Sequence, residues 1–469
     1  MSSIPPELKA FLDSGRGRLL IKGGPGVGKT CLSLEILNIL REERKGIYIT
    51  TRLQAESLLR AHPHLALSVK PVPAEDISRL SEELEEGKPI LFPMVRLSRV
   101  RRSLGYLISL LEAIENPIVV FDSWQAFIDQ FPPKLRHELL LETSNWAEQS
   151  RNIVIYVSES IREGKLDYIA DGVVHLYHKS IEGRRIRLLE IKKLRGIPVR
   201  RCRYLFTLQG GRFTVLKDWE FKVVKKKDRR GTLFKKDLSQ ETVSTGIGEL
   251  DKAIGGWKKG SINILEISRG VGEGYLSLVM PLAQANLNYG RGFLVIPSMG
   301  RSGYRIVENF LEGHVNKDKW GMFRFVQGSR TPGAREKDFV TYIDVSNPDE
   351  VAKQVLNVAR KLSERSRDGV IICLIGMDTL ELYIGAEKTL ELLNNLAVYA
   401  RSTGAIVFLL YKQGQEVSKM VLHLADKHLK LIRINDVVLF YGVIPYTPVY
   451  SIYTETSRGY PQSRVKMVI

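Results

Sequence analysis

Short apolar runs alternate with segments of helical spacing through the first half of the chain. The apolar runs of strand length are residues 18–22, 46–51, 118–122 and 152–158. The segments that read as helices are residues 30–43, 103–115 and 137–150. Strands that alternate with helices predict a mostly parallel sheet covered by helices on both faces, so we expect an α/β fold.

The second half of the chain repeats the first half weakly. Residues 25–34 and 269–278 are identical at six of ten positions, at an offset of 244. Residues 121–123 resemble residues 377–379 at an offset of 256, which pairs Asp122 with Asp378. Offsets that nearly agree are expected when loops differ in length, so the repeat predicts two copies of one fold.

A basic segment separates the two copies. Residues 220–236 contain eight Lys or Arg residues and only two acidic ones, with few apolar side chains to bury. Such a composition is typical of a linker or an exposed arm. We therefore expect a first domain at 1–219, a basic linker at 220–240 and a second domain at 241–469.

Composition narrows the class of protein. With 44% hydrophobic and 26% charged residues the chain reads as globular, and its longest apolar run is too short to cross a bilayer. The N-terminus has no basic region followed by an apolar stretch, so we expect a cytoplasmic protein. The three cysteines form no CxxC motif, so neither a disulfide framework nor a zinc site is expected.

The net charge of +18 leaves two interpretations open. It favours an anionic partner, which includes nucleotides, nucleic acids and acidic proteins, or it only keeps the surface soluble. A cluster of Arg96, Arg99, Arg101 and Arg102 is suited to contact phosphates, but the same spacing is typical of a solvated helix face or a subunit contact.

A glycine-rich segment after the first strand carries a complete phosphate-binding motif. Its residues are Gly23, Gly24, Pro25, Gly26, Val27, Gly28, Lys29 and Thr30, which satisfy G-x-x-x-x-G-K-[ST]. The glycines let backbone N–H groups approach the phosphates, and the following helix adds its positive end. We expect Lys29 to reach the β- and γ-phosphates and the Thr30 hydroxyl to bind Mg²⁺.

An apolar strand at residues 117–121 leads into Asp122. A carboxylate at the C-terminal edge of a parallel sheet is placed to hold Mg²⁺ through water beside such a loop. We therefore predict Thr30 and Asp122 as metal-binding residues, and Lys29 and Asp122 as catalytic residues.

These motifs resemble the RecA superfamily and its KaiC-like branch. Residues 244–251 resemble that branch's domain opening, and residues 168–174 and 187–196 resemble its closing strands. The resemblance implies ATP as the nucleotide and a homo-oligomer, with a hexamer as one option. It also implies that Lys193 and Arg195, which match a K-x-R-G turn, contact the phosphate bound to a neighbouring subunit. Without the resemblance, a solvated basic strand is the simpler interpretation.

The layout also resembles the archaeal gas vesicle protein D (GvpD) family, whose characterised members regulate gas vesicle formation. The sequence departs from an ATPase pattern, however. Thr50 and Thr51 replace the paired glutamates that activate water in KaiC-like enzymes, and Glu159 is the alternative carboxylate.

In the second copy, Glu273 replaces the phosphate-binding lysine and Gly274 the metal-binding hydroxyl residue. Residues 458–459 form a candidate equivalent of the closing turn. We therefore expect the second copy to lack a triphosphate site.

The sequence thus predicts an ATP-binding protein with a regulatory or scaffolding role. We expect a protein partner, slow or absent hydrolysis and one nucleotide per chain. The alternative is a RecA-related DNA-binding ATPase of recombination or repair, which the basic charge favours. A translocating ATPase and an autokinase fit less well, because the expected base and the second phosphate-binding lysine are missing.

Overall fold

The computed structural model divides the chain into two compact units. It describes residues 3–15, 17–50, 55–63, 70–71, 90–93, 116–149, 152–220, 237–298, 304–328, 337–412, 421–457 and 460–469. Unit 1 comprises residues 1–216 with 468–469, and unit 2 comprises residues 217–467.

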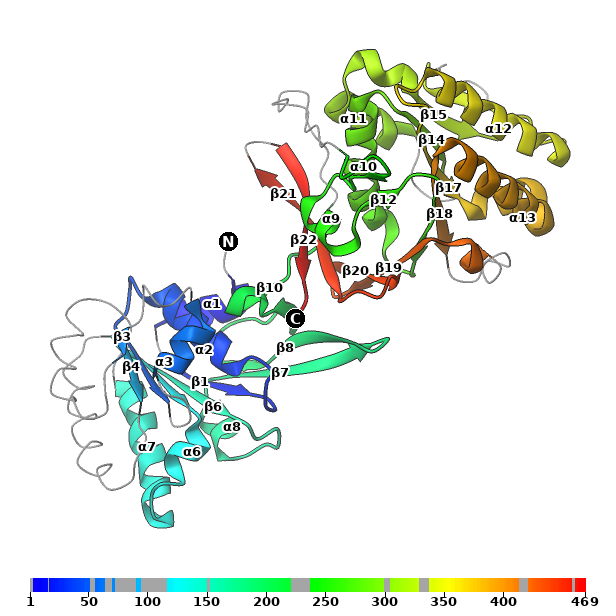
Figure 1. The fold of residues 1–469 in the computed structure, drawn as a ribbon. Coiled ribbons are helices and arrows are strands. Elements are labelled where there is room, and N and C mark those ends of the chain that lie inside the picture. The colour runs from blue at the N-terminus through cyan, green and yellow to red at the C-terminus, as the bar shows by residue number, and fades with distance from the viewer. Residues whose placement is uncertain are drawn as a thin grey trace. The chain divides into compact units, whose positions relative to one another are not determined.

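Unit 1 is built on a mixed sheet in the order β10-β9-β8-β7-β1-β6-β5-β2-β4-β3 (Figure 1). Its strands are β1 (Gly17–Lys22), β2 (Gly46–Thr50), β3 (Lys70–Pro71), β4 (Ile90–Pro93), β5 (Ile118–Asp122), β6 (Ile153–Ser158), β7 (Gly172–Ile181), β8 (Arg184–Leu194), β9 (Arg203–Thr207) and β10 (Thr214–Val215). Strands β1 to β7 run parallel, whereas β8, β9 and β10 are added antiparallel.

Helices cover both faces of this sheet. They are α1 (Pro6–Asp13), α2 (Lys29–Leu40), α3 (Ala55–Ala61), α6 (Trp124–Ile128), α7 (Pro133–Gln149) and α8 (Lys165–Ile169). The apolar residues of α1, α2 and α3 pack with Leu19 and Ile21 of β1, while those of α6 and α7 pack with Leu20. The continuous apolar runs seen in the sequence therefore belong to strands that are buried on both sides.

Unit 2 repeats this topology except at one edge, where the two outermost strands follow each other in the opposite chain order. Its main sheet has the order β16-β15-β14-β17-β18-β13-β19-β20-β21-β22. Its strands are β13 (Ile262–Ile267), β14 (Gly292–Ile296), β15 (Phe323–Gln327), β16 (Val340–Tyr342), β17 (Ile371–Gly376), β18 (Ile406–Lys412), β19 (Lys427–Ile434), β20 (Val437–Ile444), β21 (Tyr450–Ser457) and β22 (Tyr460–Met467). The predicted α/β fold in two copies is confirmed by the matching strand orders.

The helices of unit 2 also lie on two faces. Helices α9 (Gly248–Ile254), α10 (Leu276–Tyr289) and α11 (Tyr304–His314) share one core, and α12 (Pro348–Arg365) and α13 (Met377–Thr403) share the other. A small ladder of β11 (Thr242–Val243) and β12 (Trp257–Lys258) precedes β13. Its two strands lie on either side of residues 244–251, the predicted domain opening of the second copy, whereas in unit 1 helix α1 precedes β1.

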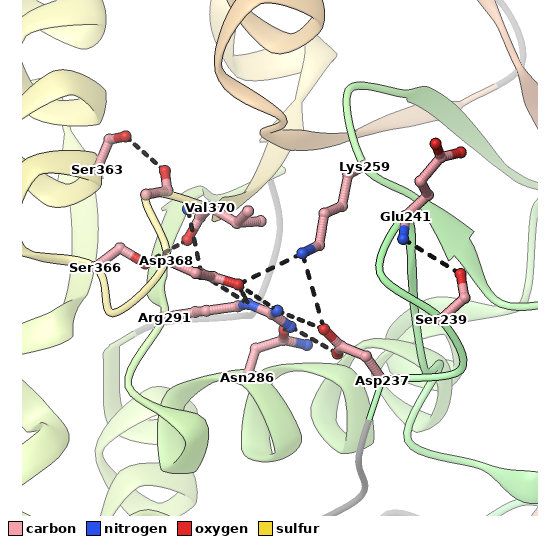
Figure 2. Close-up of polar contacts among 11 residues, drawn as sticks. Asp237, Ser239, Glu241, Lys259, Asn286, Arg291, Ser363, Ser366, Asp368 and Val370 are labelled. Atoms are coloured by element: carbon pink, nitrogen blue, oxygen red, sulfur yellow. Dashed lines mark hydrogen bonds and ion pairs between the residues drawn. The ribbon is translucent and has the colours of Figure 1, made fainter.

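A buried charge cluster fixes the beginning of unit 2. Arg291 donates hydrogen bonds to Asp237 at 2.6 and 2.8 Å, to Asp368 at 2.5 Å and to Asn286 at 3.1 Å (Figure 2). Lys259 lies 3.5 Å from the Asp368 carboxylate. A buried guanidinium is tolerated only when its donors are paired, so these contacts attach Asp237 to the edge of the sheet where β14 begins.

Several predictions fall outside the described residues. These concern the helix at 103–115, the arginine cluster at 96–102, Thr51, residues 221–236 of the linker and residues 458–459. The predicted domain bounds of 1–219, 220–240 and 241–469 stay a prediction. In the part of the chain that the structure describes, no helix is both long and apolar enough to span a membrane.

Candidate nucleotide site

The loop between β1 and α2 has a backbone that only glycine tolerates at two of its positions. Gly23 has φ 154°, and a Cβ there would lie 2.4 Å from the carbonyl oxygen of Leu176. Gly28 has φ 105°, and a Cβ there would lie 3.0 Å from the Leu208 side chain. The motif glycines are therefore required by the shape of the loop as well as by its approach to phosphate.

Lys29, the first residue of α2, folds back over this loop. Its ammonium group donates to the carbonyl oxygens of Gly23 at 2.7 Å and Gly24 at 2.8 Å, and the residue is only 7% exposed. In the described structure no side chain caps the first turn of the 12-residue helix α2. The N-terminal end of this helix and the Lys29 ammonium together place positive charge beside the loop, as phosphate binding requires.

The structure brings Thr30 and Asp122 into direct contact. The Thr30 hydroxyl donates to Oδ2 of Asp122 at 2.7 Å, and the Tyr48 hydroxyl donates to the same oxygen. Burial, together with the Asp122 charge, raises the pKa of Tyr48 well above its usual value, so this phenol stays a proton donor. Mg²⁺ accepts hydroxyl and carboxylate oxygens as ligands. Thr30 at the beginning of α2 and Asp122 at the end of β5 therefore fit the predicted metal.

Sequence reasoning missed two residues of this site. Tyr48 lies in the middle of β2, between two buried isoleucines, where an aromatic residue reads as core. Arg187 of β8 donates to the carbonyl oxygen of Gly26 at 2.8 Å, although 161 residues separate the two. Both contacts depend on strand order in the sheet, so no local sequence signal marks them.

The candidate water-activating positions lie at the same edge of the sheet. Thr50, the last residue of β2, is buried and pairs with Asp122 in the ladder. Glu159 follows directly after β6 and is partly exposed. A buried threonine beside the carboxylate cannot accept a proton at neutral pH.

Lys193 and Arg195 lie away from the phosphate-binding loop of their own unit. Lys193 pairs with Val173, which lies opposite Leu20 in the middle of β1, whereas the loop begins after Lys22 at the end of that strand. Its ammonium donates to the carbonyl oxygen of Asp167 at 3.2 Å, and Arg195 donates to Asp171 at 2.9 Å. Both side chains point to the same segment, and none of their contacts with the described residues joins them to residues 23–30.

Unit 2 has no equivalent phosphate-binding loop in the part of the chain that the structure describes. Gly272–Tyr275 forms a 3₁₀ turn before α10, and a Cβ on Gly274 would lie 2.9 Å from the Val438 side chain. No residue larger than glycine fits there without displacing Val438, so a hydroxyl ligand is excluded by packing.

The strand register also corrects the alignment of the second carboxylate. If β13 is aligned with β1 as in the repeat, the ladders to β18 and β6 place Gly376 at the position of Asp122. The pairing of Asp122 with Asp378 is therefore wrong by two residues. Asp378 lies in the first turn of α13 and accepts bonds from Ser298 and Lys412, both at 2.7 Å.

The same register corrects the position of the closing turn in unit 2. The β7–β8 and β19–β20 pairs carry a bulge at the same place, which aligns Lys193 with Ile444 and Arg195 with Tyr446. The candidate residues 458–459 lie outside the described residues, and the register places the positions equivalent to 193–195 at residues 444–446. Ile444 is 46% exposed and Tyr446 65% exposed, so unit 2 presents apolar groups where unit 1 presents cations.

Comparisons with known proteins agree with this geometry. A family model for the KaiC ATPase matches residues 14–220. Protein GvpD1 of Halobacterium salinarum is 25% identical over 521 aligned residues, covering 98% of this chain and 95% of that protein. Protein GvpD2 of the same organism is 25% identical over 493 residues, covering 98% and 96%.

Circadian clock protein KaiC2 of Synechocystis is 25% identical over 285 residues, covering 57% of this chain and 46% of that protein. The family model covers the phosphate-binding loop, Asp122, Lys193 and Arg195. The chain contains a KaiC-like ATPase domain and is a KaiC/GvpD-like protein of the RecA superfamily.

Proposed function

We propose that the chain binds one ATP with Mg²⁺ in unit 1 and uses it to control assembly or a protein partner in the cytoplasm. The observation that carries this proposal is the cluster of Lys29, Thr30 and Asp122 around a loop that leads into a helix whose first turn no side chain caps. The protein thereby acts as a nucleotide-dependent regulator or scaffold and turns over slowly or not at all.

In this mechanism the residues of unit 1 exchange internal contacts for ligand contacts. Lys29 leaves the carbonyl groups of Gly23 and Gly24 and pairs with the β- and γ-phosphates. Thr30 and Asp122 would hold Mg²⁺ with their oxygens, and the metal would add positive charge to these phosphates. Tyr48 keeps its hydroxyl on Asp122 and so orients the carboxylate.

The neighbouring subunit supplies Lys193 and Arg195 in this proposal. Neither residue contacts the phosphate-binding loop of its own unit, because Lys193 bonds to Asp167 and Arg195 bonds to Asp171. This supports a contact with the phosphate bound to a neighbouring subunit. ATP then favours the assembled arrangement, because only that arrangement adds these cations to the phosphate charge. Two exposed apolar residues, Ile161 and Tyr168, lie in the segment before β7 that Lys193 contacts, which supports a subunit edge there.

The second candidate function is a DNA-binding ATPase of the recombinase type, which the net charge of +18 favours. DNA binding that weakens linearly with the logarithm of salt concentration would support it, because each neutralised phosphate releases counterions. Fluorescence anisotropy with a labelled oligonucleotide at two salt concentrations separates the two functions.

The nucleotide site is tested with Lys29→Ala. Removing the ammonium takes away the charge that neutralises phosphate, so binding of a fluorescent ATP analogue should disappear in equilibrium titration. Lys9→Ala is the control, because Lys9 forms only a partly exposed pair with Asp13 on α1. Unchanged affinity in a folded Lys29→Ala protein would overturn the proposed function.

A further inference from the structure

Arg187 approaches the phosphate-binding loop from the side opposite to Asp122. In the order β8-β7-β1-β6-β5, strand β8 lies two positions from β1 on one side and β5 lies two positions away on the other. Asp122 at the end of β5 contacts Thr30, while Arg187 of β8 donates through Nη1 to Gly26. The loop is therefore held between a carboxylate and a guanidinium.

The guanidinium of Arg187 has no counter-ion among the described residues. No carboxylate forms an ion pair with it there, and its buried Nε has no hydrogen-bond partner. Two buried cations of unit 1, by contrast, are paired with carboxylates: Arg18 contacts Asp171 at 2.9 Å, and Lys22 contacts Asp167 at 2.6 Å. Burial and the nearby Arg185 lower the pKa of Arg187, although arginine remains charged at neutral pH.

A partly buried cation without a carboxylate is unfavourable unless an anion completes its surroundings. Beside this loop the proposed nucleotide supplies such an anion. We propose that Arg187 is a second phosphate-binding cation of the nucleotide site, contributed by the same chain as Lys29. The inference rests on the proposed function and adds a residue to its binding site.

The shape of arginine fits this role. Its planar fork carries five donors, so Nη1 can keep the Gly26 carbonyl while the remaining N–H groups turn to a phosphate oxygen. The metal-binding residues Thr30 and Asp122 lie on the other side of the loop. Arg187 therefore acts on the phosphate chain independently of Mg²⁺, and both ATP and ADP should depend on it.

The test compares Arg187→Met, which keeps length without charge, with Arg187→Lys, which keeps charge without the fork. Arg185→Met is the matched control, because Arg185 is an exposed arginine two residues away on the same face of β8. Titration with ATP and with ADP, with Mg²⁺ and with EDTA, should show a loss of affinity of about tenfold or more for Arg187→Met. Arg187→Lys should lose less, and Arg185→Met should stay within about twofold, because solvent screens exposed charge.

Thermal unfolding without nucleotide separates binding from a structural role. Arg187→Met removes an unpaired buried charge, so the free protein should be as stable as the wild type or more stable while its affinity falls. A destabilised free protein with unchanged affinity would show that Arg187 only supports the loop, and would overturn the inference.

If Lys29→Ala abolishes binding while Arg187→Met binds like wild type, this inference alone fails. If the wild type binds neither nucleotide, the proposed function fails and the inference fails with it.

Discussion

The Thr30 hydroxyl donates a 2.7 Å hydrogen bond to the carboxylate of Asp122, although 92 residues separate them in the chain. Two residues predicted independently as Mg²⁺ ligands therefore meet at one point. The contact depends on the sheet order, because β5 and β1 both end at the edge from which α2 starts. Each residue satisfies the other's hydrogen-bonding group, and the Thr30 hydroxyl oxygen still has a lone pair to offer Mg²⁺ while it donates to Asp122.

Tyr48→Phe should weaken the Mg²⁺-dependent part of ATP binding. The change removes the second hydroxyl that holds Oδ2 of Asp122 and leaves the ring packing intact. A hydrogen bond to a charged group contributes about 1.5–3 kcal/mol, so we expect a loss of roughly tenfold or more in titrations with Mg²⁺ and none with EDTA. Tyr156→Phe is the control, since Tyr156 is equally buried but bonds to Thr143. Equal effects of the two changes would contradict the orienting role of Tyr48.

Turnover should be slow, because the buried Thr50 stands where a carboxylate would activate water. Phosphate release measured with saturating ATP should stay well below about 1 per second, the lower end of ordinary enzyme rates. Faster release would show that another group acts as base. In that case Glu159→Gln should abolish it, because Glu159 is the carboxylate that follows β6 at the same edge.

Calorimetry should return one ATP per chain. Changing Glu273 to Lys together with Gly274 to Thr should leave this number at one, because the threonine Cβ would approach Val438 to 2.9 Å. The double change restores the lysine and threonine of the sequence motif but not the shape of the phosphate-binding loop. A second site in the wild type would contradict the absence of a nucleotide site in unit 2. A second site only in the double variant would show that Val438 can move.

The sequence predicted the fold of both units because the buried strands are continuous apolar runs with clear glycine and charge boundaries. The phosphate-binding loop was predictable because eight adjacent residues carry it. Tyr48 and Arg187 were not predictable, since their partners lie 74 and 161 residues away. The pairing of Asp122 with Asp378 was wrong because it relied on the similarity of residues 121–123 to residues 377–379. The strand register, which the sequence does not show, places Gly376 at the position of Asp122.

Unit 2 should lose local stability as the pH falls from about 6.5 to about 4. Burial lowers the pKa of His314 to about 4, so the folded state disfavours its proton more than the unfolded state does. The contribution of neutral His314 to stability is fully present above its pKa of about 6.5 in the unfolded chain. This contribution is lost as the pH falls towards its pKa of about 4 in the folded protein. Hydrogen exchange of α11, corrected for the intrinsic pH effect, should rise across this window.

His314→Gln should flatten that pH dependence, because glutamine does not titrate. His137→Gln, which changes an exposed histidine of unit 1, should leave it unchanged. A pH profile of α11 that is the same in the wild type and in His314→Gln would assign the effect to other groups.

Arg195→Ala should weaken ATP-dependent assembly more than it weakens ATP binding. Arg195 is 57% exposed and shares Asp171 with the buried Arg18, which bonds that carboxylate at 2.9 and 3.1 Å. Removing Arg195 therefore leaves Asp171 paired, and an exposed ion pair contributes only about 0–1 kcal/mol to stability. The variant should fold normally and still hold ATP through Lys29.

In the proposed assembly Arg195 leaves Asp171 and meets the phosphate of a neighbouring subunit. Charge-assisted contacts of this kind contribute about 1.5–3 kcal/mol, so the assembly constant with ATP should fall roughly tenfold or more. Arg203→Ala is the matched control, because Arg203 is a similarly exposed arginine paired with Glu190 on β8. Sedimentation of the three proteins with and without ATP measures the difference. A wild type that stays monomeric with saturating ATP, or an Arg195→Ala protein that assembles equally well, would show that Lys193 and Arg195 form an ordinary solvated strand end.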